Sequence, residues 1–580
     1  MMRRSMTGLR SFFKPFAGIL ILVVVSCSTR IERIPPASTA FRPIAARSGM
    51  VVSSHYLASD VGLEVLKSGG NAVDAAVATG LALAVVHPAA GNIGGGGFMI
   101  VYRNDGAVTA FDFREKAPLA AHERMYLDGQ GAYRKDLNHE GYLSVGVPGT
   151  VAGFDLALRR LGTKPWAELV KPSVELARNG FPLSYSMARD FASLQNDFRT
   201  YPASANVFLR EDGSLYDQGE LWRQPDLART LQRIGEDGKD GFYRGETARL
   251  LAADMKKNGG LVTEEDLATY SAVEREPVRG TYRGYEVISM CPPSSGGTAL
   301  IEMLNVLEGY DLKAAGHNSA RYLHLLTESM RLAYADRARH LGDPDFNPGL
   351  PLERLLSKEY AVEQRGRIDE SRAGTSSPAD VAGEEGEQTT HYSVVDRYGN
   401  AVVVTYTLEY GYGSRIVADG LGFLLNNEMG DFNPAPGRTD STGMIGTIPN
   451  RVVPGKRMLS SMTPTILAKD GKPWALIGSP GGRTIINTVL QVSLNLIDFN
   501  MNIAEAVSAK RVHHQWLPDL LRMENRATTL DSRMMLESMG HRVREGGYQG
   551  SVMAIVMDRK NGLLWGASDP RSSDAAAVGY

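Results

Sequence analysis

Apolar and polar residues follow each other in patterns that divide the first part of the chain into a strand and two helices. Residues 46–53 are mostly apolar and predict a first strand. Ser59 can cap a helix that runs to about Lys67 and stops at a Ser-Gly-Gly turn. Asn71 can cap the next helix, over residues 72–86, which is apolar on nearly all faces. A helix without a polar face is expected to be buried.

The middle and the C-terminal part of the chain continue with both kinds of element. Strands are predicted at residues 98–103 and 108–114, on either side of an Asn-Asp-Gly turn. Residues 151–360 show a mainly helical pattern. A hairpin across residues 469–472 then leads through a glycine-rich turn into a helical segment at residues 483–496. Strand and helix patterns thus both occur in this part of the chain.

The sharpest change of pattern lies at Thr389. Residues 369–388 are rich in Ser, Ala, Gly, Asp and Glu and have almost no large apolar side chains, which is typical of a mobile surface segment. Residues 391–395 and 401–407 are rich in Val, Tyr and Thr and enclose a turn, so they predict a β-hairpin. Centring that turn sets Thr389 opposite Thr407, and a slip of one residue would undo this pairing.

A threonine at such a junction has two interpretations. Its hydroxyl becomes a nucleophile when the residue begins a chain and its own α-amino group takes the proton. Thr389 can create that state itself, if its hydroxyl attacks the carbonyl of Gln388 and water then splits the ester. Thr407 would hold or polarise the hydroxyl. Alternatively, Thr389 and Thr390 simply open an ordinary strand, since threonine is common in strands.

Composition excludes some classes of protein. The 580 residues are 43% hydrophobic and 22% charged, as in ordinary soluble globular proteins, and they provide ample material for a large core. The formal net charge of −2 shows no excess of basic residues of the kind that binds nucleic acid. No break in composition other than residues 369–388 suggests a linker between domains.

The N-terminus has the features of an export signal. Basic residues precede the apolar run at residues 16–25, which is too short to span a bilayer as a helix. The run ends in Val-Val-Ser-Cys, which resembles a bacterial lipobox with Cys27 as the lipidated first residue of the mature protein. The alternative is a plain signal peptide. Because Cys291 is the only other cysteine, a lipidated Cys27 leaves no partner for a disulfide. By analogy, Ser28 favours anchoring to the outer membrane, with the protein facing the periplasm.

Several further motifs are ambiguous when each is taken alone. Arg114 at a strand end is a solvated charge or a carboxylate clamp. Glu428 and Asp431 follow an apolar segment read as a strand and can face one point, although surface acids are the plainer interpretation. The glycines at residues 478–482 form a ready oxyanion hole, or only a tight turn.

Two other motifs do not support the chemistry they suggest. The glycine-rich residues 91–99 lack the Gly-Lys-Ser/Thr ending of a phosphate-binding loop. His513 and His514 are adjacent on an extended segment, so they point in opposite directions, and no cysteine or acid lies nearby at ligand spacing. We therefore predict no metal and no cofactor.

Taken together, these motifs resemble the γ-glutamyltransferases of the N-terminal-nucleophile hydrolase superfamily. The resemblance rests on Gln388-Thr389-Thr390-His391-Tyr392-Ser393-Val394, the acid pair within residues 425–431, Ser460-Ser461 and the glycines at 478–482. It extends over essentially the whole mature chain, from residues 71–99 through Phe111-Asp112-Phe113-Arg114-Glu115 to Gly566-Ala567-Ser568-Asp569-Pro570-Arg571. Several motifs in this order are highly specific.

The resemblance implies an α/β (α+β) fold, a four-layer αββα sandwich of the N-terminal-nucleophile hydrolase type. It would follow a signal peptide at residues 1–26 and a tether at 27–45, and consist of a large subunit (46–388) and a small subunit (389–580) that form a heterodimer. The expected roles are nucleophile for Thr389, hydroxyl partner for Thr407, oxyanion donors for Gly481 and Gly482, α-carboxylate ligands for Arg114, Ser460 and Ser461, and α-ammonium ligands for Glu428 and Asp431. The expected substrates are glutathione and other γ-glutamyl compounds, with water, amino acids or dipeptides as acceptors.

One residue departs from the family pattern. Glu409 stands where relatives usually have asparagine, so it either reinforces ammonium binding or repels the carboxylate. Residues 433–457 are long enough to form a lid over the site. Two alternative functions are an acylase for glutaryl groups of β-lactams, against which Glu428 and Asp431 argue, and an unprocessed envelope binding protein, against which Thr389 argues.

Overall fold

Two stacked β-sheets form the centre of the protein. The computed structural model describes residues 41–580 except 135–136, 378–388, 439 and 442–445. The first sheet, in spatial order, contains β1 (Ile44–Ala46), β18 (Leu563–Ser568), β17 (Met553–Asp558), β13 (Lys472–Ile477), β12 (Thr465–Lys469), β9 (Tyr285–Ser289) and β8 (Val278–Tyr282). The second contains β19 (Ala576–Gly579), β2 (Met50–Ser53), β10 (Thr390–Val395), β11 (Ala401–Thr407), β3 (Gly96–Tyr102), β4 (Val108–Phe113) and β7 (Val273–Arg275).

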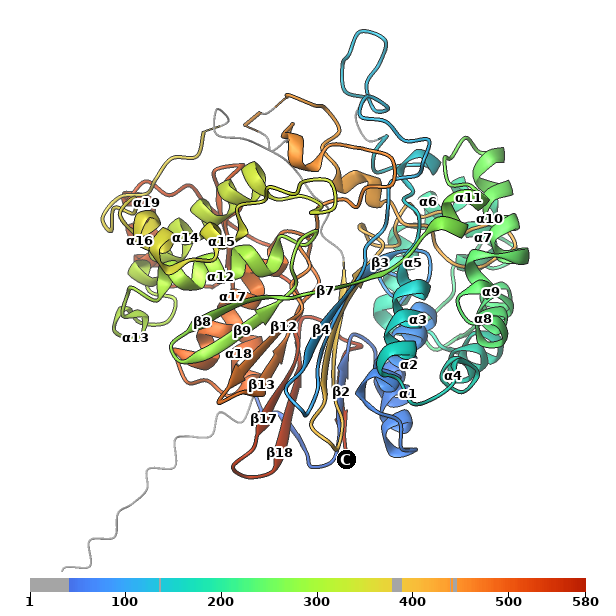
Figure 1. Ribbon diagram of the computed structural model, residues 1–580, viewed down its shortest axis with the longest axis horizontal. Helices are drawn as coiled ribbons and strands as arrows, with labels where there is room; N and C mark the ends of the chain where they lie inside the picture. The colour runs from blue at the N-terminus through green and yellow to red at the C-terminus, as the bar shows by residue number, and fades with distance from the viewer. Residues whose placement is uncertain (1–40, 135–136, 378–388, 439, 442–445) are drawn as a thin grey trace, which may run out of the picture. The chain divides into compact units, whose positions relative to one another are not determined.

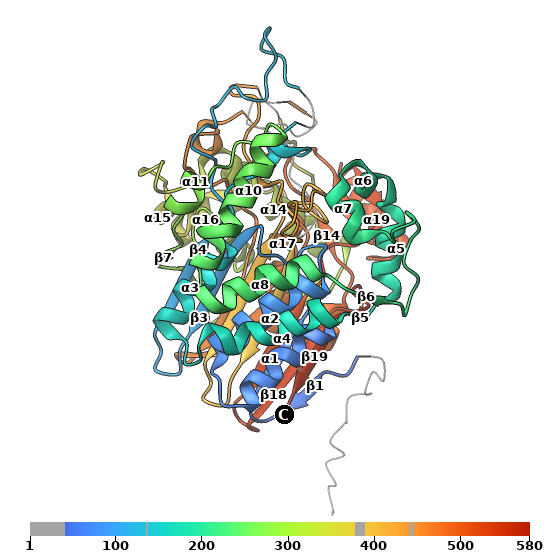
Figure 2. The same cartoon turned by 90° about the vertical axis from the view of Figure 1, so that its right-hand side faces the viewer.

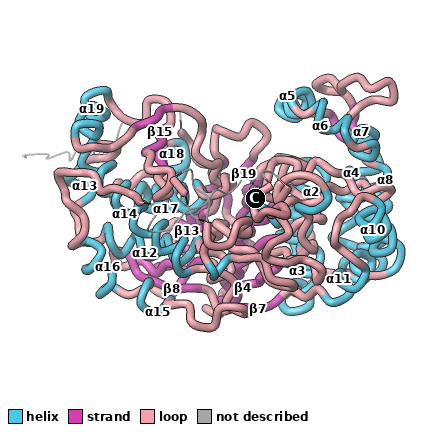
Figure 3. Tube along the Cα trace, turned by 90° about the horizontal axis from the view of Figure 1, so that it is seen from above, coloured by secondary structure: helices cyan, strands magenta, loops and turns pink. Residues whose placement is uncertain are grey.

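Helices cover the outer face of each sheet (Figure 1; Figure 2). Those over the second sheet are α1 (Tyr56–Lys67), α2 (Ala72–Val86) and α3 (Thr150–Leu161), with α4 (Trp166–Asn179) and α8 (Pro225–Asp237) outside them. Those over the first sheet are α12 (Gly296–Leu307), α17 (Thr484–Ile497) and α18 (Ile503–Ser508), with α14 (Ala320–His340) beside α12. Seen from above, the strands lie between the two helical layers (Figure 3). The expected αββα sandwich is therefore confirmed.

The remaining elements surround this sandwich. The other helices are α5 (Tyr185–Ser193), α6 (Gln195–Thr200), α7 (Pro202–Phe208), α9 (Asp240–Tyr243), α10 (Gly245–Lys257), α11 (Glu264–Thr269), α13 (Leu312–Ala315), α15 (Leu352–Leu355), α16 (Lys358–Arg365) and α19 (Leu530–Ser538). The short strands are β5 (Phe181–Pro182), β6 (Leu221–Trp222), β14 (Val512–His513), β15 (Leu521–Met523) and β16 (Val543–Glu545). Among the described residues, no helix is long and apolar enough to cross a bilayer.

Both faces of the second sheet are buried, which explains its apolar strands. On β11, Val403 packs into the core between the sheets, whereas Val402 and Val404 pack into the core beneath α1–α4. Successive side chains of a strand point to opposite faces, so a strand buried on both sides needs apolar residues at every position. The hairpin predicted around Thr389 thus lies in the middle of the sandwich, as β10 and β11.

The N-terminal elements differ from the prediction in two places. The expected strand at residues 46–53 is two strands, because β1 joins the first sheet and β2 the second. Ser59 does not cap α1, which begins at Tyr56 with the His55 side chain accepting from the amide of Leu57. The Ser59 hydroxyl instead lies inside the helix, 2.7 Å from the Ser53 hydroxyl. The capping box at Asn71 and the burial of α2 are as predicted.

Two other predictions need correction. The region from residue 151 to 360 is mainly helical, but it also supplies β7, β8 and β9, which sequence patterns missed. The segment before Glu428 is not a strand of either sheet, since it makes only an isolated bridge between Val417 and Leu424. Glu428 and Asp431 lie instead on a 3₁₀ turn, Glu428–Asp431.

Candidate active site

Thr389 lies immediately before β10, with only 5% of its surface exposed. The register of the hairpin pairs Thr390 with Tyr406, so Thr389 faces Thr407 as the sequence predicted. The Thr389 hydroxyl is 3.4 Å from the Thr407 hydroxyl, toward which it donates. Thr407 is held in turn, because its hydroxyl accepts from the amide of Glu409 at 2.9 Å. The pair therefore has the arrangement expected of a hydroxyl and its positioning partner.

Arg114 follows β4 and is fully buried rather than solvated. Its guanidinium lies 2.5 Å from Glu428, also pairs with Asp431, and lies 3.3 Å from Glu115. It points in addition toward the carbonyls of Met458 and Leu459. The two acids of the 3₁₀ turn thus face one point, and that point is the guanidinium.

Burial perturbs the charges of this cluster. It disfavours the charged guanidinium, but the carboxylates of Glu428, Asp431 and Glu115 outweigh that effect and raise the pKa of Arg114 above its ordinary value. Burial also raises the pKa of Glu428 well above the usual range, and Glu115, Asp431 and Glu409 add to the increase although Arg114 opposes it. One cation among four acids gives the cluster an excess of acidic groups, which suits an ammonium group.

A small pocket brings most of the predicted site residues together. We call it the charged pocket; it is lined by Arg114, Thr389, Thr407, Glu409, Glu428, Asp431, Ser460, Ser461, Met462, Gly482 and Ile485. Its volume of about 20 Å³ holds about one water molecule, because the charged side chains contact one another across it. Residues from three separate parts of the sequence thus converge beside the Thr389 hydroxyl.

The two glycines take different places. Gly482 lines the charged pocket, whereas Gly481 lines a neighbouring cavity with Thr484 and Tyr548. Both have positive φ, 127° for Gly481 and 52° for Gly482, which only glycine adopts readily. A tight turn between β13 and α17 therefore requires these residues, and Gly482 is the one that lines the same pocket as Thr389.

Two residues at the site were missed by sequence reasoning. His139 lies 3.1 Å from Glu409 and stacks on Tyr410 at 4.9 Å. Arg337 of α14 donates to the Ser461 hydroxyl at 3.0 Å and to the Ser295 hydroxyl at 2.8 Å. Glu409 itself has a φ of 80°, which is unusual for a residue with a long side chain. No local pattern marks these contacts, because each joins segments far apart in the sequence.

The segment that leads to Thr389 is anchored before residue 378. The Arg331 guanidinium donates to the Ser376 hydroxyl at 2.6 Å, and the Ser376 amide donates to Asp519 at 2.9 Å. The Gly374 amide donates to Glu328 at 3.2 Å. The first part of the predicted mobile segment is therefore bound to the body of the protein, while residues 378–388, including Gln388, lie outside the described residues.

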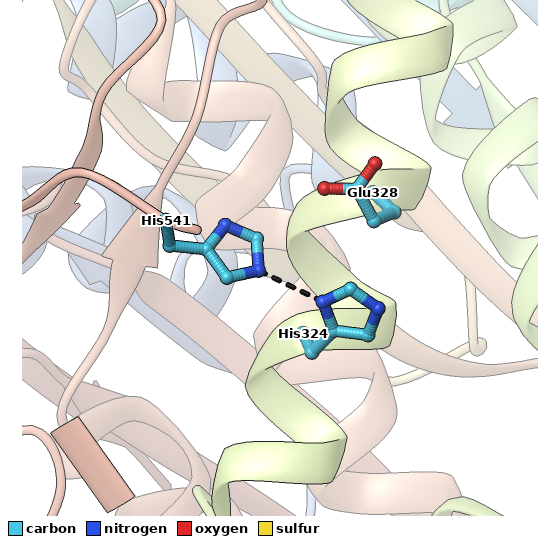
Figure 4. Close-up of side chains that lie close together, drawn as sticks. All are labelled: His324, Glu328 and His541. Carbon is cyan, nitrogen blue, oxygen red and sulfur yellow. Dashed lines mark hydrogen bonds between the residues drawn. The ribbon is translucent and has the colours of Figure 1, made fainter. Parts of the chain in front are cut away.

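A cluster of potential metal ligands, not considered from sequence, lies beside this anchor (Figure 4). His324, Glu328 and His541 are buried and offer ligand atoms within 4.8 Å of one another. The His324 Nδ1 and His541 Nε2 atoms lie 2.8 Å apart, and His324 Nε2 lies 2.8 Å from the Asp369 carbonyl. Glu328 contacts Arg331. These protein contacts account for the arrangement as an anchor for residues 369–376.

The other sequence motifs are placed as follows. His513 lies 2.8 Å from Gln515 and 2.7 Å from Asn487, whereas His514 lies 3.1 Å from Asp519, an acid that the sequence interpretation overlooked. Cys291 is buried and forms no disulfide with any residue in the described part of the chain. Cys27 and the export signal lie outside the described residues, as do residues 439 and 442–445 of the predicted lid.

Comparison with known proteins gives a consistent result. The family model described as gamma-glutamyltranspeptidase matches residues 58–579. The chain is 47% identical over 554 residues to the glutathione hydrolase proenzyme of Escherichia coli K12, covering 94% of this chain and 95% of the relative. It is also similar to two solved structures. The cephalosporin acylase from Bacillus halodurans is 28% identical with a TM-score of 0.82, covering 94% of this chain and 98% of the acylase. The Helicobacter pylori gamma-glutamyltranspeptidase is 49% identical with a TM-score of 0.55, covering 56% of this chain and 92% of that one.

The match over nearly the whole described chain and the identity to full-length relatives agree with the sandwich fold and with the residues around Thr389. The chain belongs to the γ-glutamyltranspeptidase family.

Proposed function

We propose that the protein is a self-processing γ-glutamyltransferase and glutathione hydrolase. The observation that carries this proposal is the position of the Thr389 hydroxyl, which meets Thr407 on one side and lines a pocket with a buried cation and buried acids. The name of the Escherichia coli relative, glutathione hydrolase proenzyme, supports both the reaction and the processing.

Processing would create the catalytic residue. The Thr389 hydroxyl oxygen attacks the Gln388 carbonyl carbon, the peptide C–N bond breaks, and an ester joins the two residues. Water hydrolyses this ester, so a large subunit ends at Gln388 and a small subunit begins at Thr389 with a free α-amino group. The interleaving of β10 and β11 from the small subunit between β2 and β3 of the large one would keep the two polypeptides together as a heterodimer.

The same hydroxyl would then act on the substrate. The α-amino group of Thr389 takes the hydroxyl proton as the oxygen attacks the γ-amide carbon, and passes the proton to the departing amine. The γ-glutamyl ester that results is transferred to water or to an acceptor amine. We assign stabilisation of the oxyanion to the Gly482 and Gly481 amides, with Gly482 nearest the pocket.

The charged pocket would recognise the zwitterionic end of the γ-glutamyl group. Arg114, with Ser460 and Ser461, provides donors for the α-carboxylate, and Glu428 and Asp431 provide acceptors for the α-ammonium. Because these charges now pair with one another, the substrate would replace the contacts between Arg114 and the acids. We propose that Glu409 adds to the ammonium side, since it lines the charged pocket and contributes to the raised pKa of Glu428.

The structural similarity to a cephalosporin acylase makes a glutaryl acylase the second candidate. Glutaryl and γ-glutamyl groups differ only in the α-amino group, so two chromogenic p-nitroanilides distinguish the candidates. A site with buried acids should prefer the γ-glutamyl compound by about 10²-fold or more in kcat/KM, because the acids are left unpaired by the glutaryl group.

The preference should depend on the acids of the charged pocket. Glu428→Gln should reduce it by at least about tenfold, whereas the exposed Glu175→Gln on α4, which changes the same charge, should leave it unaltered. Faster cleavage of the glutaryl compound would establish the acylase, and cleavage of neither would favour a binding protein. Release of glutamate and cysteinylglycine from glutathione, followed by mass spectrometry, identifies the donor.

We propose that the protein is exported and anchored through Cys27 to the outer membrane, facing the periplasm. The lipobox-like residues before Cys27 support this proposal. Cys27→Ala should release the protein from the membrane fraction into the soluble periplasmic fraction. A wild-type protein that is already soluble after cell lysis would overturn the lipid anchor.

A further inference from the structure

A second cavity also reaches Thr389. It has a volume of about 260 Å³, compared with about 20 Å³ for the charged pocket, and Thr389 is the only described residue that lines both. We call it the open cavity; it is lined by Ser54, His87, Pro88, Ala89, Ser186, Met187, Asp190, Thr389, Tyr412, Pro480, Ser551, Arg571, Ser572, Ser573 and Asp574. Asp190 and Ser573 are exposed, so the cavity opens to solvent.

Arg571 is the only permanently charged cation on this lining, and its guanidinium is fully engaged elsewhere. Its nitrogens contact both carboxylate oxygens of Glu524, lie 2.9 Å from Asp569, and donate to the carbonyls of Val507 and Ala509. A guanidinium has five N–H donors, so these contacts leave no strong donor for a ligand carboxylate. Arg571 therefore stabilises the segments that line the cavity and is not available to bind a ligand.

The acids on the lining are not neutralised in the same way. Asp574 accepts from the hydroxyls of Ser184 and Ser186, and Asp190 lies 3.5 Å from the Tyr412 hydroxyl. Within the part of the chain that the structure describes, neither carboxylate forms an ion pair. Burial lowers the pKa of His87 to about 4, although Asp574 opposes the shift, so this imidazole is neutral at pH 7. Burial raises the pKa of Asp190 above its ordinary value, and the Tyr412 hydroxyl and Arg189 oppose the rise. The lining thus carries two acids that no ion pair neutralises.

We propose that the open cavity binds the acceptor of the transfer reaction and that, in place of the amino acids and dipeptides implied by the family resemblance, it prefers amines that carry a second positive charge and no carboxylate, such as linear diamines. This inference rests on the proposed function, since it assigns the second substrate of the same nucleophile. Thr389 at the junction of the two cavities supports it, because the γ-glutamyl ester in the charged pocket would face an amine in the open cavity. The acids Asp190 and Asp574 favour the distant ammonium and disfavour a carboxylate at that position.

The transfer step is balanced without any further reactant. One amine of the acceptor, in its neutral form, attacks the ester carbon, and a C–N bond forms. The bond between that carbon and the Thr389 oxygen breaks, and the proton lost by the attacking nitrogen passes through the Thr389 α-amino group to this oxygen. The products are a γ-glutamyl amide and the free hydroxyl, while the second ammonium of the diamine remains beside the acids.

Three acceptors with five carbon atoms each provide the test: 1,5-diaminopentane, pentylamine and 5-aminopentanoate, with γ-glutamyl-p-nitroanilide as donor. All three share an aminobutyl unit, which ends in an ammoniomethyl, methyl or carboxylate group. We expect acceptor kcat/KM to fall in that order, with about a tenfold difference between the diamine and the amino acid, as is reasonable for charges in a solvent-exposed cavity. Equal values for the three acceptors, or a preference for 5-aminopentanoate, would overturn the proposal.

Substitutions of the two acids test whether they cause the preference for the diamine. Asp574→Asn retains an oxygen for the serine hydroxyls and should reduce the ratio of diamine to amino acid by about threefold to fivefold. Asp190 is exposed, so Asp190→Asn should not disturb the core. This variant should also reduce the ratio of diamine to amino acid. Asp237→Asn, an exposed acid at the end of α8, is the matched control and should not change the ratio. An unchanged ratio in both cavity variants would contradict the assignment.

A binding measurement separates this inference from the proposed function. Isothermal titration of 1,5-diaminopentane into the purified protein, without donor, should give weaker binding for Asp574→Asn than for the wild type. If the donor is not cleaved at all, the proposed function fails, while the titration still decides whether the cavity binds diamines. Absence of binding to the wild type, together with equal acceptor rates, would reject the inference alone.

Discussion

The two sides of Thr389 are built in opposite ways. The charged pocket has a volume of about 20 Å³ and is closed by buried side chains that pair with one another, whereas the open cavity has a volume of about 260 Å³ and is lined by one exposed acid, Asp190, and one half-buried acid, Asp574. Buried charges that contact each other hold a ligand in one orientation and discriminate strongly between ligands, because an incorrect ligand leaves the charges unpaired. Solvated charges attract a class of ligands with little demand on shape.

Because the two cavities at Thr389 are built differently, one nucleophile can select its donor strictly and its acceptor loosely. On the donor side, Arg114 meets three carboxylates at once, so only a group that replaces those contacts can enter. On the side of the open cavity, Asp574 accepts from the hydroxyls of Ser184 and Ser186. Hydrolysis also requires that water can reach the ester. We therefore expect changes in the charged pocket to have large effects, and changes in the open cavity to have small ones.

The largest effect is expected from Arg114→Gln. The change leaves Glu428, Asp431 and Glu115 buried without their cation, which should cost about 3 kcal/mol of stability. Donor kcat/KM should fall by about 10²-fold or more, because the carboxylate of the donor loses its clamp. Urea unfolding and donor kinetics measure the two effects. Arg160→Gln, at an exposed ion pair with Glu274, is the control and should have little effect on stability or kinetics. An effect of Arg114→Gln as small as that of the control would refute the contrast between the two sides.

The next effect concerns pH and tests whether burial of Glu115, which lies 3.3 Å from Arg114, makes the folded protein less stable when Glu115 is ionised. Burial raises the pKa of Glu115 to about 7 from an ordinary value of 4.5. Between these values the folded state holds a proton that the unfolded state has lost, so the free energy of unfolding should decrease as pH rises through this window. Glu115→Gln should remove about 2 kcal/mol of the decrease between pH 5 and pH 8.

Urea unfolding at the two pH values measures this difference. The exposed Glu64→Gln on α1 is the matched control and should keep the wild-type dependence on pH. Parallel behaviour of Glu115→Gln and the wild type would mean that Glu115 is charged in the folded protein across this range.

A smaller effect is expected at the junction of the two sides. Thr407→Val removes the oxygen 3.4 Å from the Thr389 hydroxyl and should lower kcat by about tenfold, equivalent to roughly 1.4 kcal/mol. Donor KM should change little, because Thr407 carries no charge for the zwitterion. Thr407→Ser should restore most of the rate, and a valine variant with wild-type kcat would show that Thr407 does not position the nucleophile.

The sequence predicted the centre of the site better than its surroundings. The turn composition before Ala401 defined the register of β10 and β11, so the pairing of Thr389 with Thr407 followed from local pattern. The burial of α2 and the turn before α17 followed in the same way. The convergence of Arg114 with Glu428 and Asp431, by contrast, came from the family resemblance, since no periodicity links residues more than 300 positions apart.

The errors share one physical cause, which is tertiary override of local preference. Ser59 has the composition of an N-cap, yet its hydroxyl bonds Ser53 and the Ala576 carbonyl, while His55 caps the helix. The strands β8 and β9 lie within a long helical region; β9 pairs with the distant β12, and β8 pairs with β9. The contacts of His139 with Glu409 and of Arg337 with Ser461 exist only after folding.

The central claim is that the chain cuts itself before Thr389 and uses the new terminus as its nucleophile. Intact-mass spectrometry and N-terminal sequencing of the purified wild type and of Thr389→Ala test it directly. The account predicts two polypeptides for the wild type, the smaller beginning Thr-Thr-His-Tyr, and a single uncut, inactive chain for the variant. A wild-type chain that cleaves γ-glutamyl-p-nitroanilide while remaining uncut, or that is cut elsewhere, would contradict it.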